Sequence, residues 1–221
     1  MPGPRILVTD FDGTITNNDF YRLITDHALP PGTPDFWAEY LSGKITHFEA
    51  INNTFGAAAI GEARLSLLAT MMEPDPELGP CVESLTAAHW SVVVASAGCQ
   101  WYIDRILTKA CVRNKVEVHS NPGRVIEGRL VMTLPRNAAY FSEQTGVDKV
   151  AIVKAAVNQG GVVAFAGDGP PDLAPALLVR PELRFARGHL AQALTELNES
   201  FRPYSRWSEV ARALVSEPRF S

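Results

Sequence analysis

Residues 6–14, with the sequence ILVTDFDGT, decide the fold. The first four of them are all apolar or β-branched, and the acidic residues Asp10 and Asp12 follow at once. A continuous run of this kind is typical of a strand that is buried on both faces in a parallel sheet, because a strand with one wet face alternates. The stretch therefore predicts a buried strand that ends in a pair of carboxylates.

Three further runs resemble the first one. Residues 91–95 and 162–166 are rich in Val and Ala, and residues 183–186 form a weaker run. Apolar residues at helical spacing separate these strands, over residues 78–89, 103–110 and 150–157. Strands that alternate with helices indicate an α/β fold with right-handed crossovers, that is, a Rossmann-like parallel sheet.

Two segments depart from that alternation. Residues 17–76 contain no convincing strand and carry four short helical patterns, so we expect a small helical cap inserted directly after the first strand. The core domain is then expected to comprise residues 1–16 and 77–221. Residues 116–132 predict a β-hairpin that turns near residues 121–123, whose sequence is Asn-Pro-Gly.

The composition excludes several classes of protein. The 221 residues include 20 Lys and Arg against 24 Asp and Glu, a net charge of −4, which argues against a nucleic-acid binder with a basic face. No apolar run approaches the roughly 18 residues that cross a bilayer. We expect no signal peptide, because residues 1–5 lead straight into the first strand, and three cysteines without metal-ligand spacing favour a cytoplasmic protein. The oligomeric state is left open.

Acidic side chains follow two of the predicted inner strands. Asp10 and Asp12 are alternate residues of an extended chain, so both can face one site, where they share a proton or hold a cation. The run at residues 167–172, GDGPPD, adds Asp168 and Asp172. Each motif alone is also compatible with an ordinary turn. Because ligands bind beyond the carboxyl ends of parallel strands, and no His or Cys is near in sequence, the four carboxylates favour Mg²⁺ over zinc.

Two other residues suit an anion at the same edge of the sheet. Ser96 is expected at the end of a strand and the start of a helix, where a hydroxyl and free N–H groups can bind phosphate, although Ser is also a routine helix cap. Lys149 follows Asp148 at the start of a helix, where the helix dipole disfavours a cation. A solvated surface lysine is the alternative for Lys149 alone.

The order Asp-x-Asp-x-Thr, Ser, Lys, Gly-Asp-x-x-x-Asp resembles the haloacid dehalogenase superfamily of aspartate-nucleophile phosphotransferases. The resemblance implies that Asp10 is the nucleophile, which forms an aspartyl-phosphate. It implies that Asp12 protonates the leaving oxygen and then activates water. Asp168, the Asp10 side chain and the Asp12 backbone carbonyl are implied to hold Mg²⁺.

The same resemblance implies how the phosphate is bound. Asp172 is implied to support Lys149 or a metal-bound water. The groups implied to bind the phosphoryl oxygens are those of Gly13, Thr14, Ser96, Ala97 and Lys149. The substrate is then a small phosphorylated metabolite.

The helical insertion is similar to the cap of phosphoserine-phosphatase-like members. Asp19 falls where those enzymes carry a Glu that contacts the substrate amine, and the cap residues His47 and Phe48 are candidates to reach the substrate. Where that group supplies an Arg for the serine carboxylate, this chain has the sequence INNTF at residues 51–55. The difference argues against phosphoserine as the substrate.

A second resemblance rests on segments farther along the chain, namely residues 96–103, 119–121, 134–135, 185–187 and 202–204, together with Trp207. These segments resemble the 2-hydroxy-3-keto-5-methylthiopentenyl-1-phosphate phosphatases of methionine salvage. That resemblance implies a methionine-salvage enol phosphate as substrate. A phosphoserine-phosphatase-like hydrolase, a phosphotransferase and a non-catalytic phosphate binder on the same scaffold are the alternatives.

Overall fold

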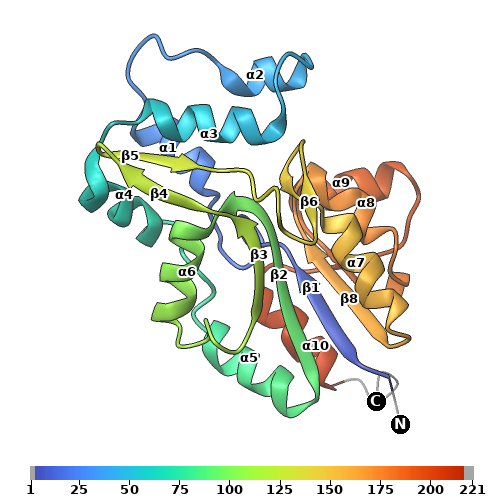
Figure 1. Cartoon of the computed structure of the whole chain (residues 1–221). Coiled ribbons are helices and arrows are strands. Elements are labelled where there is room, and N and C mark those ends of the chain that lie inside the picture. Colours follow the sequence, from blue (N-terminus) through green and yellow to red (C-terminus); the bar gives the residue numbers. More distant parts are fainter. Residues whose placement is uncertain (1–2, 217–221) are drawn as a thin grey trace.

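The computed structural model describes residues 3–216 and has a six-stranded parallel sheet at its centre, in the order β10-β9-β8-β1-β2-β3 (Figure 1). It confirms the predicted α/β fold. The central strand β1 lies between β2 and β8, so the chain crosses from one side of the sheet to the other beside it. The strands are β1 (Arg5–Thr9), β2 (Trp90–Cys99), β3 (Glu117–Asn121), β8 (Val162–Gly167), β9 (Arg184–Ala186) and β10 (Arg202–Pro203).

Both faces of β1 are buried, as its continuous apolar sequence predicts. Leu7 belongs to one hydrophobic cluster, whereas Ile6 and Val8 belong to another on the opposite face. The first cluster packs against α5 (Leu78–Ala87), α6 (Gln100–Lys109) and α10 (Trp207–Ser216), and the second against α7 (Lys149–Asn158), α8 (Leu173–Ala176) and α9 (Gly188–Glu196). The sheet is thus sandwiched between two layers of helices.

One predicted helix is shorter than its apolar pattern. The pattern over residues 78–89 includes His89, but α5 ends at Ala87, and His89 has a left-handed backbone with φ of 62°. That conformation ends the helix, so His89 does not lie on its apolar face.

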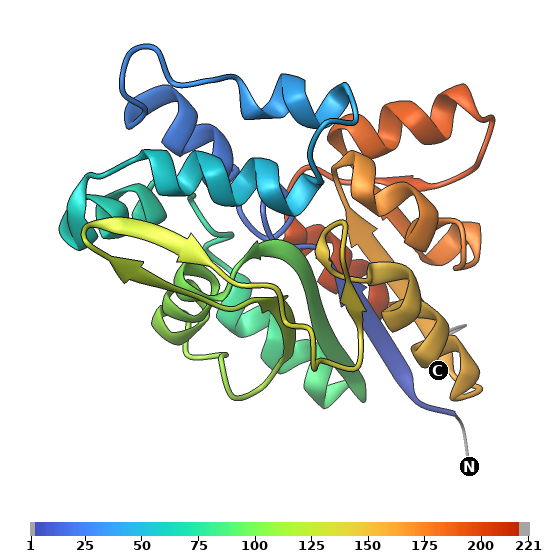
Figure 2. The ribbon, with the colours of Figure 1, turned by 45° about the horizontal axis from the view of Figure 1, so that its top comes forward.

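Four helices form an insert between β1 and α5, near the carboxyl ends of the strands (Figures 1 and 2). We call α1–α4 the helical insert. Polar side chains begin three of them: Asp19 and Asp35 cap α1 and α2, and Thr46 forms a capping box with Glu49 at α3. The helices are α1 (Phe20–His27), α2 (Phe36–Leu41), α3 (His47–Ala57) and α4 (Gly61–Thr70).

The two ends of the insert lie side by side. Thr16 and Pro74 form an isolated antiparallel bridge, and the Asn17 backbone N–H donates to the Glu73 carbonyl over 3.0 Å. The insert also shares apolar packing with the sheet, because Phe20 belongs to the same hydrophobic cluster as β1 and α6. The insert is therefore fixed in position against the ends of the strands by hydrogen bonds and apolar packing.

The hairpin forms at a different turn from the predicted one. Residues 117–121 pair in parallel with β2 as β3, and the hairpin consists of β4 (Gly123–Ile126) and β5 (Arg129–Met132). Its turn residues are Glu127 and Gly128, with φ values of 48° and 76°. Two positive φ values in a two-residue turn match the twist of a hairpin, whereas Asn121 and Pro122 only end β3 and redirect the chain. A second, short hairpin pairs β6 (Phe141–Ser142) with β7 (Gly146–Val147).

The second strand runs farther than the sequence suggests. β2 continues to Cys99, and its register against β3 shifts between Ala95 and Cys99. α6 begins only at Gln100, so Ser96 lies on an irregular strand end and not at a helix N-terminus. The bulged strand can still turn the Ser96 side chain toward a site, which is a common use of such irregularities.

The thiols of Cys81, Cys99 and Cys111 are all free. Among the described helices, none combines the length and the apolar character that a membrane span requires. The expectation that no signal peptide is present falls partly on Met1 and Pro2, which lie outside the described residues.

Candidate active site

The carboxylates of β1 and β8 converge because these strands are parallel neighbours. Thr9 pairs with Ala166, and the Asp10 backbone N–H donates to the Ala166 carbonyl over 2.9 Å. Asp10 and Asp168 therefore leave the sheet at the same edge. One carboxylate oxygen from each of Asp10, Asp168 and Asp172 lies within 4.8 Å of the others.

Lys149 stands between two of these carboxylates. Its Nζ lies 2.6 Å from Asp10 Oδ1 and 2.7 Å from Asp172 Oδ1, and all three side chains are buried. Burial disfavours the charge of Lys149, but the two carboxylates outweigh it and raise the pKa of the ammonium group. Lys149 is the first residue of α7, which Asp148 caps, and it is not a solvated surface lysine.

The aspartates carry more negative charge than Lys149 can neutralise. Burial raises the pKa of Asp10 to about 6, even though Lys149 opposes the shift, and Asp172 adds to it. Burial also raises the pKa of Asp168 to about 8, with further contributions from Asp10 and Asp172. Clustered oxygen ligands with excess negative charge fit a hard divalent cation, which would lower these pKa values.

Asp172 is fixed by the backbone of its own turn. Its Oδ2 accepts the N–H groups of Asp168 and Gly169 over 3.1 and 3.0 Å, and its Oδ1 accepts from Lys149. The turn is the 3-10 helix η1 (Pro170–Asp172), which starts with two prolines. Asp172 therefore bonds both Lys149 and the backbone of the turn that carries Asp168.

The loop after β1 is shaped to approach Asp168. The Thr14 hydroxyl donates to Asp168 Oδ1 over 3.0 Å. Gly13 has a φ of 70°, and a Cβ atom there would lie 2.4 Å from Asp168 Oδ2. Only glycine suits both that backbone and that approach. Arg187 fixes the loop from outside, because its guanidinium donates to the carbonyls of Gly13 and Thr16 over 2.5 and 2.7 Å.

Ser96 reaches the same site from β2. It is buried, its Oγ accepts from the Gly98 N–H over 2.9 Å, and it lies 3.4 Å from Asp12 Oδ2. Ala97 is held in place by Asn121, whose Nδ2 donates to the Ala97 carbonyl over 2.7 Å. The structure thus brings together the side chains predicted from three strand ends and from the start of α7.

Asp12 has neighbours that the sequence did not reveal. Its carboxylate accepts the Phe20 N–H and the Tyr102 hydroxyl, and burial raises its pKa well above the ordinary value, with contributions from Asp19 and then Asp10. The side chain of Asp12 is not one of the three that converge within 4.8 Å. The sequence predicts only the Asp12 backbone carbonyl as a metal ligand, and that prediction does not require its side chain to lie with the other three.

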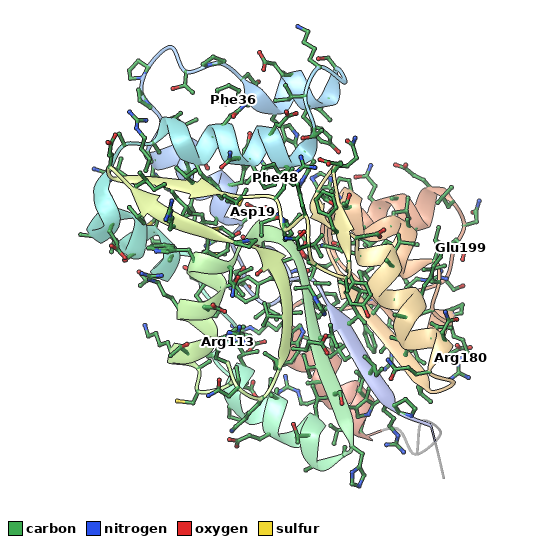
Figure 3. All side chains as sticks on the ribbon, in the orientation of Figure 1. Asp19, Phe36, Phe48, Arg113, Arg180 and Glu199 are labelled. Carbon is green, nitrogen blue, oxygen red and sulfur yellow. The ribbon has the colours of Figure 1, made fainter. Side chains whose placement is uncertain are left out.

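Three insert residues were expected near the substrate. Asp19 caps α1, and its Oδ1 accepts the Tyr21 N–H over 2.6 Å. Phe48 is buried, and its N–H donates to the Gln144 carbonyl in the β6–β7 turn over 2.8 Å. Figure 3 shows Asp19 and Phe48 on the side of the insert toward the sheet, whereas Phe36 lies farther out.

His47 begins α3 and is buried within the helical insert. Its ring packs edge-on against Trp37 and Tyr40, and Nδ1 has no hydrogen-bond partner among residues 3–216. Burial, together with the charge of Lys149, lowers the pKa of His47 to about 4, so the neutral ring lies within electrostatic range of the site.

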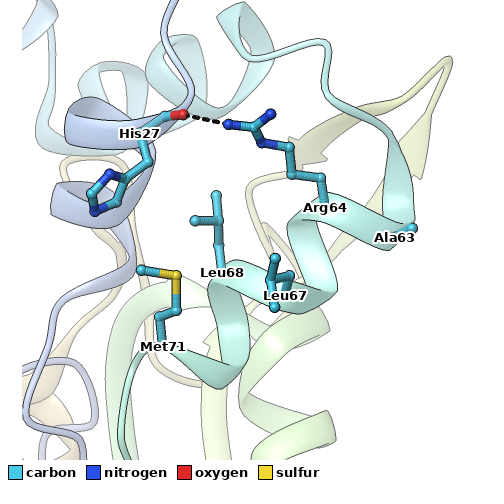
Figure 4. A pocket seen from close by; sticks show the side chains of 6 residues that line it. All are labelled: His27, Ala63, Arg64, Leu67, Leu68 and Met71. Atoms are coloured by element: carbon cyan, nitrogen blue, oxygen red, sulfur yellow. Dashed lines mark hydrogen bonds between the residues drawn. The ribbon is translucent and has the colours of Figure 1, made fainter.

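An open surface pocket lies elsewhere on the insert. It has a volume of about 550 Å³ and is situated between α1 and α4, where Arg64 donates to the His27 carbonyl over 3.1 Å (Figure 4). Its lining consists of His27, Ala63, Arg64, Leu67, Leu68 and Met71, which include no carboxylate. The converging carboxylates, and not this hollow, locate the candidate active site.

The sequence did not predict three residues that hydrogen-bond to the site residues and to the loop after β1. Tyr102, Asn121 and Arg187 all fall in segments that carry the methionine-salvage resemblance, but no local pattern assigned them a role. Their side chains reach residues that are far away in the sequence, for example over 90 positions from Tyr102 to Asp12. Only the packing of α6 and α9 against the sheet reveals these contacts.

The comparison with protein families identifies this arrangement. The model of the haloacid dehalogenase-like hydrolases matches residues 7–177, which include every strand end described above except β9 and β10. The chain belongs to the haloacid dehalogenase-like hydrolase family. A comparison with curated protein sequences found no match.

Solved structures of this family share the fold at low identity. A haloacid dehalogenase family hydrolase from Salmonella enterica serovar Typhi has a TM-score of 0.69 and 15% identity, over 99% of this chain and 73% of that one. Phosphoserine phosphatase from T. onnurineus has a TM-score of 0.63 and 16% identity, over 97% and 96%. A phosphoserine phosphatase solved as a phospho-aspartyl intermediate analogue has a TM-score of 0.60 and 16% identity, over 92% and 95%.

Proposed function

We propose that this hydrolase is a Mg²⁺-dependent phosphomonoesterase that works through an aspartyl-phosphate on Asp10. The observation that carries the proposal is the buried arrangement of Lys149 between Asp10 and Asp172 at the strand ends. A carboxylate nucleophile would repel a phosphate dianion, and a neighbouring ammonium group reduces that repulsion. The phospho-aspartyl analogue solved for a phosphoserine phosphatase of the same fold supports this chemistry.

The chain's own residues can perform both halves of the reaction. Asp10 attacks phosphorus, while Lys149 and Ser96 bind the phosphoryl oxygens with the assistance of Gly13, Thr14 and Ala97. Asp12, which has a raised pKa and can hold a proton, donates it to the leaving oxygen. Asp12 then takes a proton from the water that hydrolyses the phosphoenzyme. An Asp at this position favours hydrolysis over a stable phosphoenzyme, because water requires a base.

Asp10, Asp168 and the Asp12 backbone carbonyl would hold the Mg²⁺ ion. The cation supplies positive charge that stabilises the phosphoryl oxygens in the transition state. Asp168 is prepared for this role by Thr14 and by the close approach of Gly13, and burial raises its pKa, a cost to its negative charge that a bound cation would offset.

We propose that residues 17–76 act as a cap over the substrate. Asp19, His47 and Phe48 would face the leaving group, and the free Nδ1 of neutral His47 offers it one hydrogen bond. Because the ring is neutral, it offers no positive charge to a substrate carboxylate, which suits an uncharged polar leaving group and is compatible with a methionine-salvage enol phosphate. Phosphoserine is the second candidate, supported by the fold of phosphoserine phosphatases. The free thiols support a reducing compartment such as the cytoplasm.

The test is turnover by Asp10→Asn. With Mg²⁺ and p-nitrophenyl phosphate, we expect activity to fall by at least about 10³-fold, because asparagine cannot form the acyl phosphate. Asp35→Asn is the matched control, since it removes a carboxylate that only caps α2. If Asp10→Asn keeps turnover within about tenfold of the wild type, the nucleophile assignment is wrong.

A further inference from the structure

The carboxylate of Asp12 is held from two directions. The backbone N–H of Phe20 donates to Oδ1 over 3.2 Å, and the hydroxyl of Tyr102 donates to Oδ2 over 3.0 Å. Phe20 begins α1 in the helical insert, whereas Tyr102 lies in α6 beside the sheet. The Ser96 hydroxyl of β2 adds a longer contact of 3.4 Å to Oδ2, so Phe20 and Tyr102 supply the two shorter bonds that orient this carboxylate.

The side chain of Tyr102 lies in the hydrophobic core. Its side chain is 1% exposed, and its ring lies 4.4 Å from the ring of Phe20 and 6.5 Å from that of Phe55. Burial raises the pKa of Tyr102 well above its ordinary value, so the hydroxyl keeps its proton and donates. Its packing leaves the hydroxyl few alternative positions.

The backbone opposite Tyr102 leaves room for this hydroxyl. A Cβ atom at Gly98 would lie 2.0 Å from the Tyr102 hydroxyl oxygen and 2.7 Å from Asp12 Oδ2. Any side chain at this position would displace one or both of the bonded groups. The glycine at position 98 is therefore required by the contact between Tyr102 and Asp12.

We propose that Tyr102 is a positioning residue, whose hydroxyl acts with the Phe20 N–H to aim the Asp12 carboxyl at the leaving oxygen. The inference rests on the proposed function, in which Asp12 is the general acid. As the bond from Asp10 to phosphorus forms and the bond to the leaving oxygen breaks, the Asp12 proton passes to that oxygen. The two donors then bond the carboxylate that remains. An acid held in one orientation is a more effective catalyst than one that rotates freely.

The contact to Phe20 links this orientation to the insert. The N–H that bonds Asp12 belongs to the first residue of α1, so both donors are present only while α1 sits on the strand ends as it does here. Tyr102 is the fixed donor of the pair, and its ring also packs against the ring of Phe20. Through the Phe20 N–H and the packing of Phe20 on Tyr102, the orientation of the general acid depends on where the insert lies.

The test is Tyr102→Phe, which keeps the ring and removes only the hydroxyl. We measure kcat/KM for phenyl, p-chlorophenyl and p-nitrophenyl phosphate, whose leaving groups need protonation to a decreasing extent. We expect a fall of about tenfold or more for phenyl phosphate and less than about threefold for p-nitrophenyl phosphate, because only poor leaving groups need the acid. Tyr140→Phe is the control, since it removes a tyrosine hydroxyl away from Asp12, on a ring that packs edge-on against His119.

The variant Asp12→Asn tests whether the effect of Tyr102→Phe acts through Asp12. In that background the acid is already absent, so adding Tyr102→Phe should change kcat/KM for phenyl phosphate by less than about twofold. Equal falls for all three esters, no fall for phenyl phosphate, or an undiminished effect in Asp12→Asn would each overturn the proposal. Turnover by Asp10→Asn would contradict the proposed function itself. If Asp10→Asn is inactive but Tyr102→Phe has the same kcat/KM as the wild type for all three esters, only the role of Tyr102 is wrong.

Discussion

Replacing Lys149 by methionine removes the only positive charge described between Asp10 and Asp172. Methionine preserves most of the aliphatic volume, so the change isolates the charge. The Nζ lies 2.6 and 2.7 Å from the two carboxylates, and the three side chains are at most 9% exposed. Breaking a buried pair typically costs about 3–5 kcal/mol, because the partner charges stay buried without compensation.

The cost should depend on pH in a defined direction. Without Lys149, the folded protein relieves the repulsion by protonating one carboxylate, whose pKa then lies above its unfolded value near 3.8. A group with a raised folded pKa contributes stability at low pH and loses it as the pH rises. Taking up one proton at pH 7.5 costs up to about 5 kcal/mol, and at pH 5.5 about 2–3 kcal/mol less.

Urea unfolding at pH 7.5 and 5.5 measures both quantities. We expect Lys149→Met to lose about 3–5 kcal/mol at pH 7.5 and about 2 kcal/mol less than that at pH 5.5. Lys154→Met is the matched control, because Lys154 is an exposed residue of the same helix. Adding Asp172→Asn to Lys149→Met should restore part of the loss.

Two results would refute this reasoning. The first is a loss below about 1 kcal/mol at pH 7.5, which is the range of an exposed ion pair. The second is a loss that does not shrink at pH 5.5. Either would mean that Lys149 is not the counter-charge of two buried carboxylates.

Three further predictions concern other parts of the site. The wild type should lose about 2 kcal/mol more unfolding free energy than His47→Gln when the pH is lowered from 7 to 5. The reason is that His47, with its depressed pKa of about 4, stays neutral in the folded protein, whereas in the unfolded chain it takes up a proton below about pH 6.5. Equal losses of the two proteins in urea unfolding would contradict this prediction. Arg187→Lys should cost about 2 kcal/mol in the same assay, since lysine cannot bond the carbonyls of Gly13 and Thr16 together; a cost below about 0.5 kcal/mol would disagree. Chelation of Mg²⁺ should weaken the binding of inorganic phosphate in titration calorimetry at least about tenfold, because the carboxylates then repel the anion; an unchanged affinity would argue against a metal at the site.

The sheet and the converging carboxylates could be predicted because local sequence determines them. The run at residues 6–9 is apolar on both faces, and parallel strands bring their carboxyl ends to one edge. It follows that Asp10 and Asp168 meet there without any knowledge of side-chain packing. Lys149 could be placed at a helix start, but its burial between Asp10 and Asp172 depends on how α7 packs.

The position of the hairpin turn and the contacts of the supporting side chains could not be predicted from the sequence. They depend on competition between local signals and on long-range packing. The sequence Asn-Pro-Gly at residues 121–123 is a strong turn signal, but β3 joins the sheet there and the hairpin turns at Glu127 and Gly128 instead. The contacts of Tyr102 and Arg187 depend on helix placement and have no periodic signature. Supporting residues of this kind become visible only when the chain is folded.

The covalent step at Asp10 is the centre of the account, and trapping it is the most direct measurement. The enzyme is mixed with Mg²⁺ and p-nitrophenyl phosphate, quenched in acid during turnover, and digested for mass spectrometry. We predict that one phosphoryl group is found on the peptide that contains Asp10, and that Asp10→Asn carries none. Repeated traps without phosphate on that peptide while the wild type turns over, or phosphate on another residue, would contradict the account.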